Sequence, residues 1–119
     1  MNNRELGRIG ENVAVRHIIS RGIKPLARNY RVSRMGEIDI IAQDGDTLCF
    51  IEVKARRGDR YGTPAEAVSP IKRNTIIKVA QVYASRNEIH DMPLRFDVIE
   101  VYLEGDSSIK SVKHIKNAF

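Results

Sequence analysis

Acidic side chains interrupt two of the most apolar stretches of this sequence. Asp39 lies inside the run Gly36-Glu37-Ile38-Asp39-Ile40-Ile41, and Glu52 follows Leu48-Cys49-Phe50-Ile51. A charge in a central strand is costly unless a counter-charge or a metal ion holds it. An exposed strand edge is the alternative, but apolar residues occupy both alternating positions around each acid. The pair therefore indicates a polar site, and two carboxylates suit a hard divalent cation such as Mg²⁺ or Mn²⁺.

A lysine two residues after Glu52 extends this chemistry. Side chains alternate between the faces of a strand, so Lys54 points to the same side as Glu52. An ammonium group beside a metal-activated water could stabilise the charge that develops when a phosphodiester is cleaved. A Glu–Lys ion pair along one strand is the other interpretation, and taken alone it is the commoner one.

The turn between the two acidic stretches decides whether the acids meet. Strands are predicted at residues 37–42 and 47–55, and Asp44-Gly45 between them is a strong hairpin signal. Both strands are apolar on both faces, so we expect the hairpin to lie in the middle of the sheet. Asp44 and Gly45 are taken as the two central residues of the turn, and this choice sets the register of the two strands.

That register predicts specific neighbours across the hairpin. Glu37 would lie opposite Glu52, and Asp39 would lie opposite Phe50. Asp39 and Glu52 would be diagonal neighbours, about 7–8 Å apart. Four polar side chains would then share one face of the sheet: Glu37, Asp39, Glu52 and Lys54. An error of one residue in register would put the two acids on opposite faces.

Glu11 is a further candidate, on a predicted first helix. That helix begins at an Asn2 or Asn3 cap and ends near Ser20, before Arg21-Gly22. Glu11 falls on a stripe of small and apolar residues, which would direct it toward the sheet; the stripe contains Gly7, Ala14, Val15 and Ile18. An exposed helix glutamate remains the alternative.

The remaining elements complete an α/β fold. Strands are predicted at residues 26–32, 94–103 and 109–115, and a second helix runs from Ser69-Pro70 to residue 86 or 87. A helical crossover between the third and fourth strands should make them parallel neighbours. The expected fold is a mixed central β-sheet flanked by helices, with residues 1–119 forming a single domain.

Composition limits the possible settings. The chain has 20 Lys and Arg against 15 Asp and Glu, and its single cysteine cannot form an intramolecular disulfide. No stretch approaches the roughly 20 apolar residues of a membrane span, and the first residues lack the apolar core of a signal peptide. We therefore expect a cytoplasmic protein that does not enter the membrane.

Basic residues cluster after the acidic strand. The predicted phosphate-binding residues are Arg56, Arg57, Arg60, Lys72 and Arg73. A solvated surface is the competing interpretation. A modest excess of positive charge suits a polyanionic partner without requiring one.

Several motifs together resemble the YraN-like family, a bacterial family related to the PD-(D/E)XK restriction-endonuclease-like superfamily and often compared with Holliday junction resolvases. The resemblance covers about residues 5–102, and its motifs are Gly10-Glu11, Arg28-Asn29-Tyr30, Gly36-Glu37-Ile38-Asp39-Ile40-Ile41, Phe50-Ile51-Glu52-Val53-Lys54-Ala55-Arg56, Tyr61-Gly62 and Arg95-Phe96-Asp97-Val98-Ile99.

The resemblance implies an αβββαβ core and catalytic roles for Glu11, Asp39, Glu52 and Lys54. The expected metal ligands are Asp39, Glu52 and the carbonyl of Val53, with Glu11 bound directly or through water. Arg95 and Asp97 also resemble family positions, and we expect them to form a buried pair that braces the site, with plain surface charges as the alternative. Two departures are visible. Ile38 stands where the superfamily motif has proline, and no Gln-x-x-x-Tyr motif follows, because Gln81 and Tyr83 are only two residues apart.

The expected function is metal-dependent endonuclease activity on DNA, including branched or junction DNA. The alternative is a nucleic-acid-binding module that keeps the fold without useful catalysis. Carboxylates that repel phosphate favour the enzyme, because a pure binder has no need of them. A homodimer is left open, as is the choice between DNA and RNA.

Overall fold

In the part of the chain that the structure describes, two helices enclose a five-stranded sheet. The structure, a computed structural model, describes residues 2–57, 68–105 and 108–119. Arg60 and the Tyr61-Gly62 motif lie outside this part. The elements are α1 (Asn3–Ser20), β1 (Lys24–Val32), β2 (Gly36–Asp44), β3 (Thr47–Arg57), α3 (Pro70–Arg86), β4 (Leu94–Glu104) and β5 (Ser108–Ile115).

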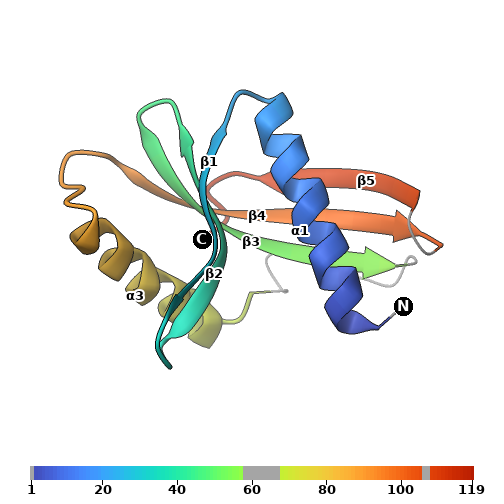
Figure 1. The fold of residues 1–119 in the computed structure, drawn as a ribbon, viewed down its shortest axis with the longest axis horizontal. Helices are drawn as coiled ribbons and strands as arrows, with labels where there is room; N and C mark the ends of the chain where they lie inside the picture. Colours follow the sequence, from blue (N-terminus) through green and yellow to red (C-terminus); the bar gives the residue numbers. More distant parts are fainter. Residues whose placement is uncertain (1, 58–67, 106–107) are drawn as a thin grey trace.

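The strands lie in the order β1-β2-β3-β4-β5, and Figure 1 shows the helices apart, with strands between them. Only the β3–β4 pair among these neighbours is parallel, as the helical crossover predicts. One apolar core lies between the sheet and α1, and a second lies between the sheet and α3. This arrangement confirms the predicted restriction-endonuclease-like α/β fold. No described helix has the length and apolar composition to cross a bilayer.

Side-chain caps and close packing explain where α1 begins and how it sits on the sheet. The Asn2 side chain accepts a hydrogen bond from the Glu5 backbone N–H at 2.9 Å, which caps the first turn. A Cβ at Gly10 would lie 2.7 Å from the Cβ of Ala55 on β3. Glycine at this position therefore permits the helix to approach β3 closely.

The second helix begins as its sequence predicts. Ser69 accepts a hydrogen bond from the Lys72 backbone N–H, and Pro70 occupies the first helical position. The helix then buries one apolar stripe, composed of Ile76, Val79, Ala80 and Tyr83, against the sheet.

The predicted register of the β2–β3 hairpin is wrong by two residues. Asp44 pairs with Thr47, and Phe50 lies opposite Ile41 rather than Asp39. The central turn residues are Gly45 and Asp46, of which only Gly45 has a positive φ, +60°. A two-residue turn with glycine first fits the twist of the strands, so the glycine takes the first central place. A shift of two residues preserves the side on which each β3 side chain lies.

Along the β1–β2 hairpin, the face of the sheet toward which alternate side chains point reverses at one residue pair. Ile38 packs in the α3-side core, whereas Ile40, two residues later, packs in the α1-side core. Asp39 lies between them, and the β1–β2 register places Asn29 opposite Asp39. Asn29 has a left-handed backbone, φ +50°, which bends β1 at this point. The alternation of the two strands therefore reverses at Asp39.

Candidate functional site

Asp39 and Glu52 lie where β2 separates from β3. The ladder pairs of the two strands end at Ile40 and Ile51, and Asp39 comes just beyond. One carboxylate oxygen of Asp39 accepts a hydrogen bond from the Val53 backbone N–H at 2.8 Å. This bond fixes the Asp39 side chain in the fork between the strands.

Glu52 is buried, Asp39 is half-buried, and the two carboxylates interact directly. Glu52 is 7% exposed, and its Oε2 has no hydrogen-bond partner within the described residues. The pKa of Asp39 is raised to about 7, mainly by burial and next by the charge of Glu52. The hydrogen bond from the Val53 N–H acts in the opposite direction. Two neighbouring acids, one buried and one half-buried, with so few donors favour the binding of a proton or a cation.

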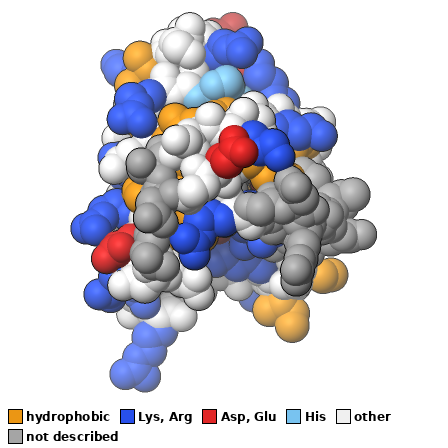
Figure 2. Space-filling model, turned by 90° about the vertical axis from the view of Figure 1, so that its right-hand side faces the viewer, with side chains coloured by type: hydrophobic (Ala, Val, Ile, Leu, Met, Phe, Trp, Pro, Cys, Tyr) orange, Lys and Arg blue, Asp and Glu red, His pale blue; other side chains and the backbone are white. Residues whose placement is uncertain are grey.

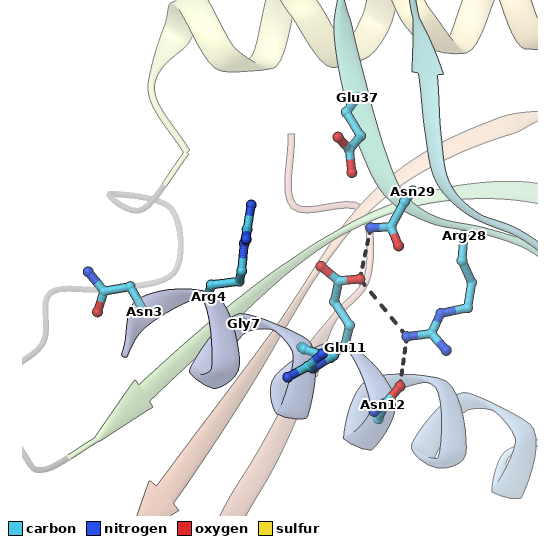
Figure 3. A pocket seen from close by; sticks show the side chains of 9 residues that line it. Asn3, Arg4, Gly7, Glu11, Asn12, Arg28, Asn29 and Glu37 are labelled. Carbon is cyan, nitrogen blue, oxygen red and sulfur yellow. Dashed lines mark hydrogen bonds and ion pairs between the residues drawn. The ribbon is translucent and has the colours of Figure 1, made fainter. Parts of the chain in front are cut away.

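Glu11 approaches from α1 and is held by β1. Asn29 donates a hydrogen bond to its carboxylate at 2.9 Å, and the guanidinium of Arg28 lies 4.0 Å away. Figure 3 shows these contacts converging on Glu11. Burial raises the pKa of Glu11, with smaller contributions in the same direction from Asp39 and Glu37. Glu11 is thus electrostatically coupled to Asp39.

Glu11 also lines a pocket of about 810 Å³ between α1 and β1. The pocket is rich in arginine and asparagine; its lining residues are Asn3, Arg4, Gly7, Arg8, Glu11, Asn12, Arg28, Asn29 and Glu37. Glu37 therefore lies with α1, and it forms an ion pair of 3.5 Å with Arg31. The expected common face of Glu37 with Glu52 does not form, because the hairpin reverses its facing at Asp39.

Lys54 lies on the face of β3 that carries Glu52. Phe50, at the same alternation, packs in the α3-side core, whereas Val53 and Ala55 meet α1 at Gly10. Lys54 is half-buried, and within the described residues it makes no hydrogen bond or ion pair. Asp39 is the link between the two sides, since it interacts with Glu11 and with Glu52.

Glu100 on β4 is a buried acid that the sequence reasoning missed. It lies beside Lys54 in the parallel ladder and is fully buried. The Tyr102 hydroxyl donates a hydrogen bond to its Oε2 at 2.8 Å, and the Arg56 Nε lies 3.9 Å from its Oε1. The sequence pattern could have predicted this buried acid, because Glu100 interrupts the apolar run Val98-Ile99-Glu100-Val101 in the same manner as Glu52 interrupts its own.

The predicted basic residues fall into different settings. Lys72 is near enough to Asp39 for its charge to lower the pKa of that carboxyl slightly against the larger opposing effects. Arg57 is exposed at the end of β3. Arg73 donates to the Val68 carbonyl at 2.9 Å, and its guanidinium lies 5.7 Å from the Phe119 ring centre. Arg73 thus fastens the start of α3 to the C-terminal residues.

Seen from the end of the sheet where β3 and β4 finish, the molecule is predominantly basic. Figure 2 shows Lys and Arg side chains outnumbering Asp and Glu on this face. A surface with an excess of positive charge attracts polyanions.

Arg95 and Asp97 form the expected buried pair, but they brace another region. Arg95 Nε donates to Asp97 at 2.9 Å, and Arg95 also pairs with Asp44 of the β2–β3 turn at 3.0 Å. Asp97 accepts further bonds from His114 at 2.8 Å and from the Asn117 backbone N–H at 2.9 Å. These contacts join the hairpin turn to the C-terminal residues and do not extend to Asp39 or Glu52.

The donor set near Asp39 fits a hard cation with two direct carboxylate ligands. Glu52 Oε2 is buried without a hydrogen-bond partner in the described part of the chain, and such an oxygen is available to a metal. Those same residues contain no group of three or more Asp, Glu, His or Cys side chains close enough to form a complete metal site.

The fold and the buried acids define a restriction-endonuclease-like α/β protein. Comparison with known proteins then gives the family. The sequence model of uncharacterised protein family UPF0102 matches residues 10–101, and the chain belongs to that family. A UPF0102 protein of Clostridioides difficile is 50% identical over the whole of both chains. One from Acetivibrio thermocellus is 46% identical, covering 99% of this chain and 93% of its own.

Proposed function

We propose that this protein is a metal-dependent endonuclease acting on DNA, with Asp39 and Glu52 as its central pair. The observation that carries the proposal is a pair of interacting carboxylates at the point where two central strands separate. Asp39 is half-buried with a raised pKa, and Glu52 is buried with one oxygen that has no hydrogen-bond partner in the described part of the chain. Such a pair destabilises the fold unless it serves a ligand, and perturbed acids of this kind are typical of functional sites.

The residues that would hold a divalent cation are Asp39, Glu52 and the Val53 carbonyl, with Glu11 through water. When bound, Mg²⁺ or Mn²⁺ would supply charge neutralisation at the phosphate and increase the acidity of water. The chain itself orients these groups. The Val53 N–H fixes Asp39, and Asn29 holds the Glu11 carboxylate at 2.9 Å.

Lys54 is the residue that we propose stabilises the transition state. It projects from β3 on the side of Glu52, and it makes no hydrogen bond or ion pair within the described residues. An ammonium group that is not committed to a protein carboxylate can meet the negative charge that accumulates as a phosphodiester is cleaved. We expect Lys54 to contribute to rate more than to affinity.

The basic side chains near the end of β3 and the start of α3 support a nucleic-acid substrate. Arg57 is exposed at the strand end, and Lys72 lies close to Asp39 at the start of α3. Phosphates that bind such residues release counterions, so affinity should decrease steeply with salt. Arg56 and Arg57 together should account for a log–log salt slope of about two.

A nucleic-acid-binding module without catalysis is the second candidate. It is favoured by the lack of a complete three-ligand metal group among residues 2–57, 68–105 and 108–119. Binding alone would need the basic surface but neither the Asp39–Glu52 pair nor Lys54.

A cleavage assay with Mg²⁺ or Mn²⁺ on branched, duplex and single-stranded DNA separates the two candidates. Wild type should cleave at least one substrate, Asp39→Asn should lose cleavage, and Lys54→Ala should lose rate while retaining affinity. Lys78→Ala, an exposed change on α3 away from the site, is the charge-matched control. DNA binding without cleavage under all these conditions would support the binding module instead.

Calorimetry tests the metal itself. Wild type should bind Mn²⁺, and the double variant Asp39→Asn, Glu52→Gln should not. Equal affinity in the two proteins would exclude these carboxylates as ligands.

A further inference from the structure

A second pocket lies between the end of α1 and the last residues of β5. Its volume is about 330 Å³. Basic side chains dominate its lining, which consists of His17, Arg21, Ile23, Val112, Lys113, His114 and Lys116. None of these described lining residues is acidic. A concave surface lined by charges of one sign concentrates the potential and attracts the opposite charge.

His114 gives this pocket a rigid, buried polar wall. Its side chain is only 8% exposed, and its Nε2 lies 2.8 Å from the fully buried Asp97. Because Asp97 occupies Nε2, Nδ1 is the ring nitrogen left to interact with a ligand in the pocket. The Asp97 carboxylate can only accept a hydrogen bond, so Nε2 carries the proton between them, and this bond fixes the orientation of the ring.

The end of α1 does not explain why these cations gather. Its last carbonyls already have donors: Ser20 Oγ bonds to the His17 carbonyl at 2.6 Å, and the Arg21 and Ile23 backbone N–H groups bond to the Ile18 carbonyl at 3.1 and 2.9 Å. The side chains of His17 and Arg21 are therefore not needed to cap the helix.

The cations instead oppose one another. The pKa of His17 is lowered by burial and then by the positive charges of Arg21 and His114. The two histidine rings are 6.5 Å apart, one edge toward the other. Lys116 forms an ion pair with Asp44, with 3.3 Å between Nζ and Oδ2, and Asp44 does not line the pocket. An anion in the pocket would relieve this repulsion.

We propose that this pocket binds a phosphate dianion, either inorganic phosphate or the phosphate group of a phosphomonoester. A doubly charged oxyanion matches several converging N–H donors, and the described lining has no Phe, Tyr or Trp on which a base would stack. The site is separate from the proposed nuclease centre. Arg21 directly follows the last residue of α1 and lies ten residues after Glu11, which corresponds to about 15 Å along the helix axis.

Histidine titration by NMR tests the proposal without reference to any activity. Adding inorganic phosphate at constant ionic strength should raise the pKa of His17 by about 1, since an anion within a few ångströms favours the charged ring. His90, exposed in the turn before β4, is an internal control and should not respond. In the double variant Arg21→Ala, Lys113→Ala, in which both changed side chains are exposed, the effect on His17 should disappear. Lys78→Ala should behave as wild type.

The source of the phosphate is distinguished by a second titration with short oligonucleotides. A response to a 5′-phosphorylated dinucleotide, but not to its 5′-hydroxyl form, would assign the pocket to nucleic-acid ends. A response to inorganic phosphate alone would assign it to free phosphate, and either result supports the site. An unchanged His17, an equal response of His17 and His90, or a response that persists in the double variant would each overturn it.

Discussion

Two aspartates in this protein, Asp97 fully buried and Asp39 half-buried, have opposite environments. Asp97 is fully buried, and Arg95, His114 and the Asn117 N–H surround it with donors that hold its pKa below the usual value, despite the burial that would raise it. Asp39 has one backbone donor and a neighbouring acid, and its pKa rises to about 7. The difference separates an acid that stabilises the fold from one that is kept ready for a ligand.

The largest expected difference between the two aspartates is in stability, and removing each carboxylate in turn tests it. Asp97→Ala leaves Arg95 without its buried partner and His114 without its acceptor, so the free energy of unfolding should fall by about 3–5 kcal/mol. Asp39→Asn removes a buried like-charge repulsion and keeps an acceptor for Val53, so it should be neutral or stabilising. Urea unfolding measures both. Similar losses in the two variants would show that the environments do not differ in this way.

The pH dependence of stability should also differ between the two acids. The pKa of Asp39 is raised in the folded state, so its favourable contribution is present below its ordinary pKa of 3.8 and is lost as the pH rises through about 7. The pKa of Asp97 is lowered, so its contribution is present above 3.8 and is lost on acidification.

In the presence of a chelator, wild type should therefore lose stability relative to Asp39→Asn between pH 5 and pH 8, by an amount on the order of 2 kcal/mol. Unfolding curves at both pH values measure the difference. A constant difference between the two proteins would contradict the raised pKa of Asp39.

A smaller effect should follow from Asn29, which bends β1 opposite Asp39. Asn29→Ala places a Cβ-bearing residue without a local hydrogen bond in the left-handed region, and it removes the donor to Glu11; a loss of about 1 kcal/mol is expected. Asn29→Gly should restore most of that stability, because glycine adopts this conformation readily. If glycine is as destabilising as alanine, the Asn29 side chain matters to stability and its backbone conformation does not.

Strand alternation predicted much of this architecture from the sequence alone. Glu52 and Lys54 share a face of β3 because their positions differ by two, and an error of two residues in the register could not change that. The parallel β3–β4 pair followed from the helical crossover. These inferences depend on periodicity, which one sequence displays directly.

The geometry around Asp39 could not be obtained in this way. The reversal of facing depends on the backbone of Asn29 in a neighbouring strand, and it places Glu37 with α1. The partners of Asp97 come from β4, β5 and the residues after β5, so no local pattern joins them. Glu100 was within reach, since it interrupts an apolar strand as Glu52 does.

The close contact of α1 with β3 couples two positions that are distant in the sequence. Gly10 has no room for a methyl group because Ala55 carries one, with 2.7 Å between the Ala55 Cβ and a Cβ built at position 10. Gly10→Ala should therefore lift the helix and withdraw Glu11 from Asp39. Exchanging the methyl, with Gly10→Ala and Ala55→Gly together, should bring the helix back. Among relatives, residue size at these two positions should vary in a compensating manner, so that the pair changes together or not at all.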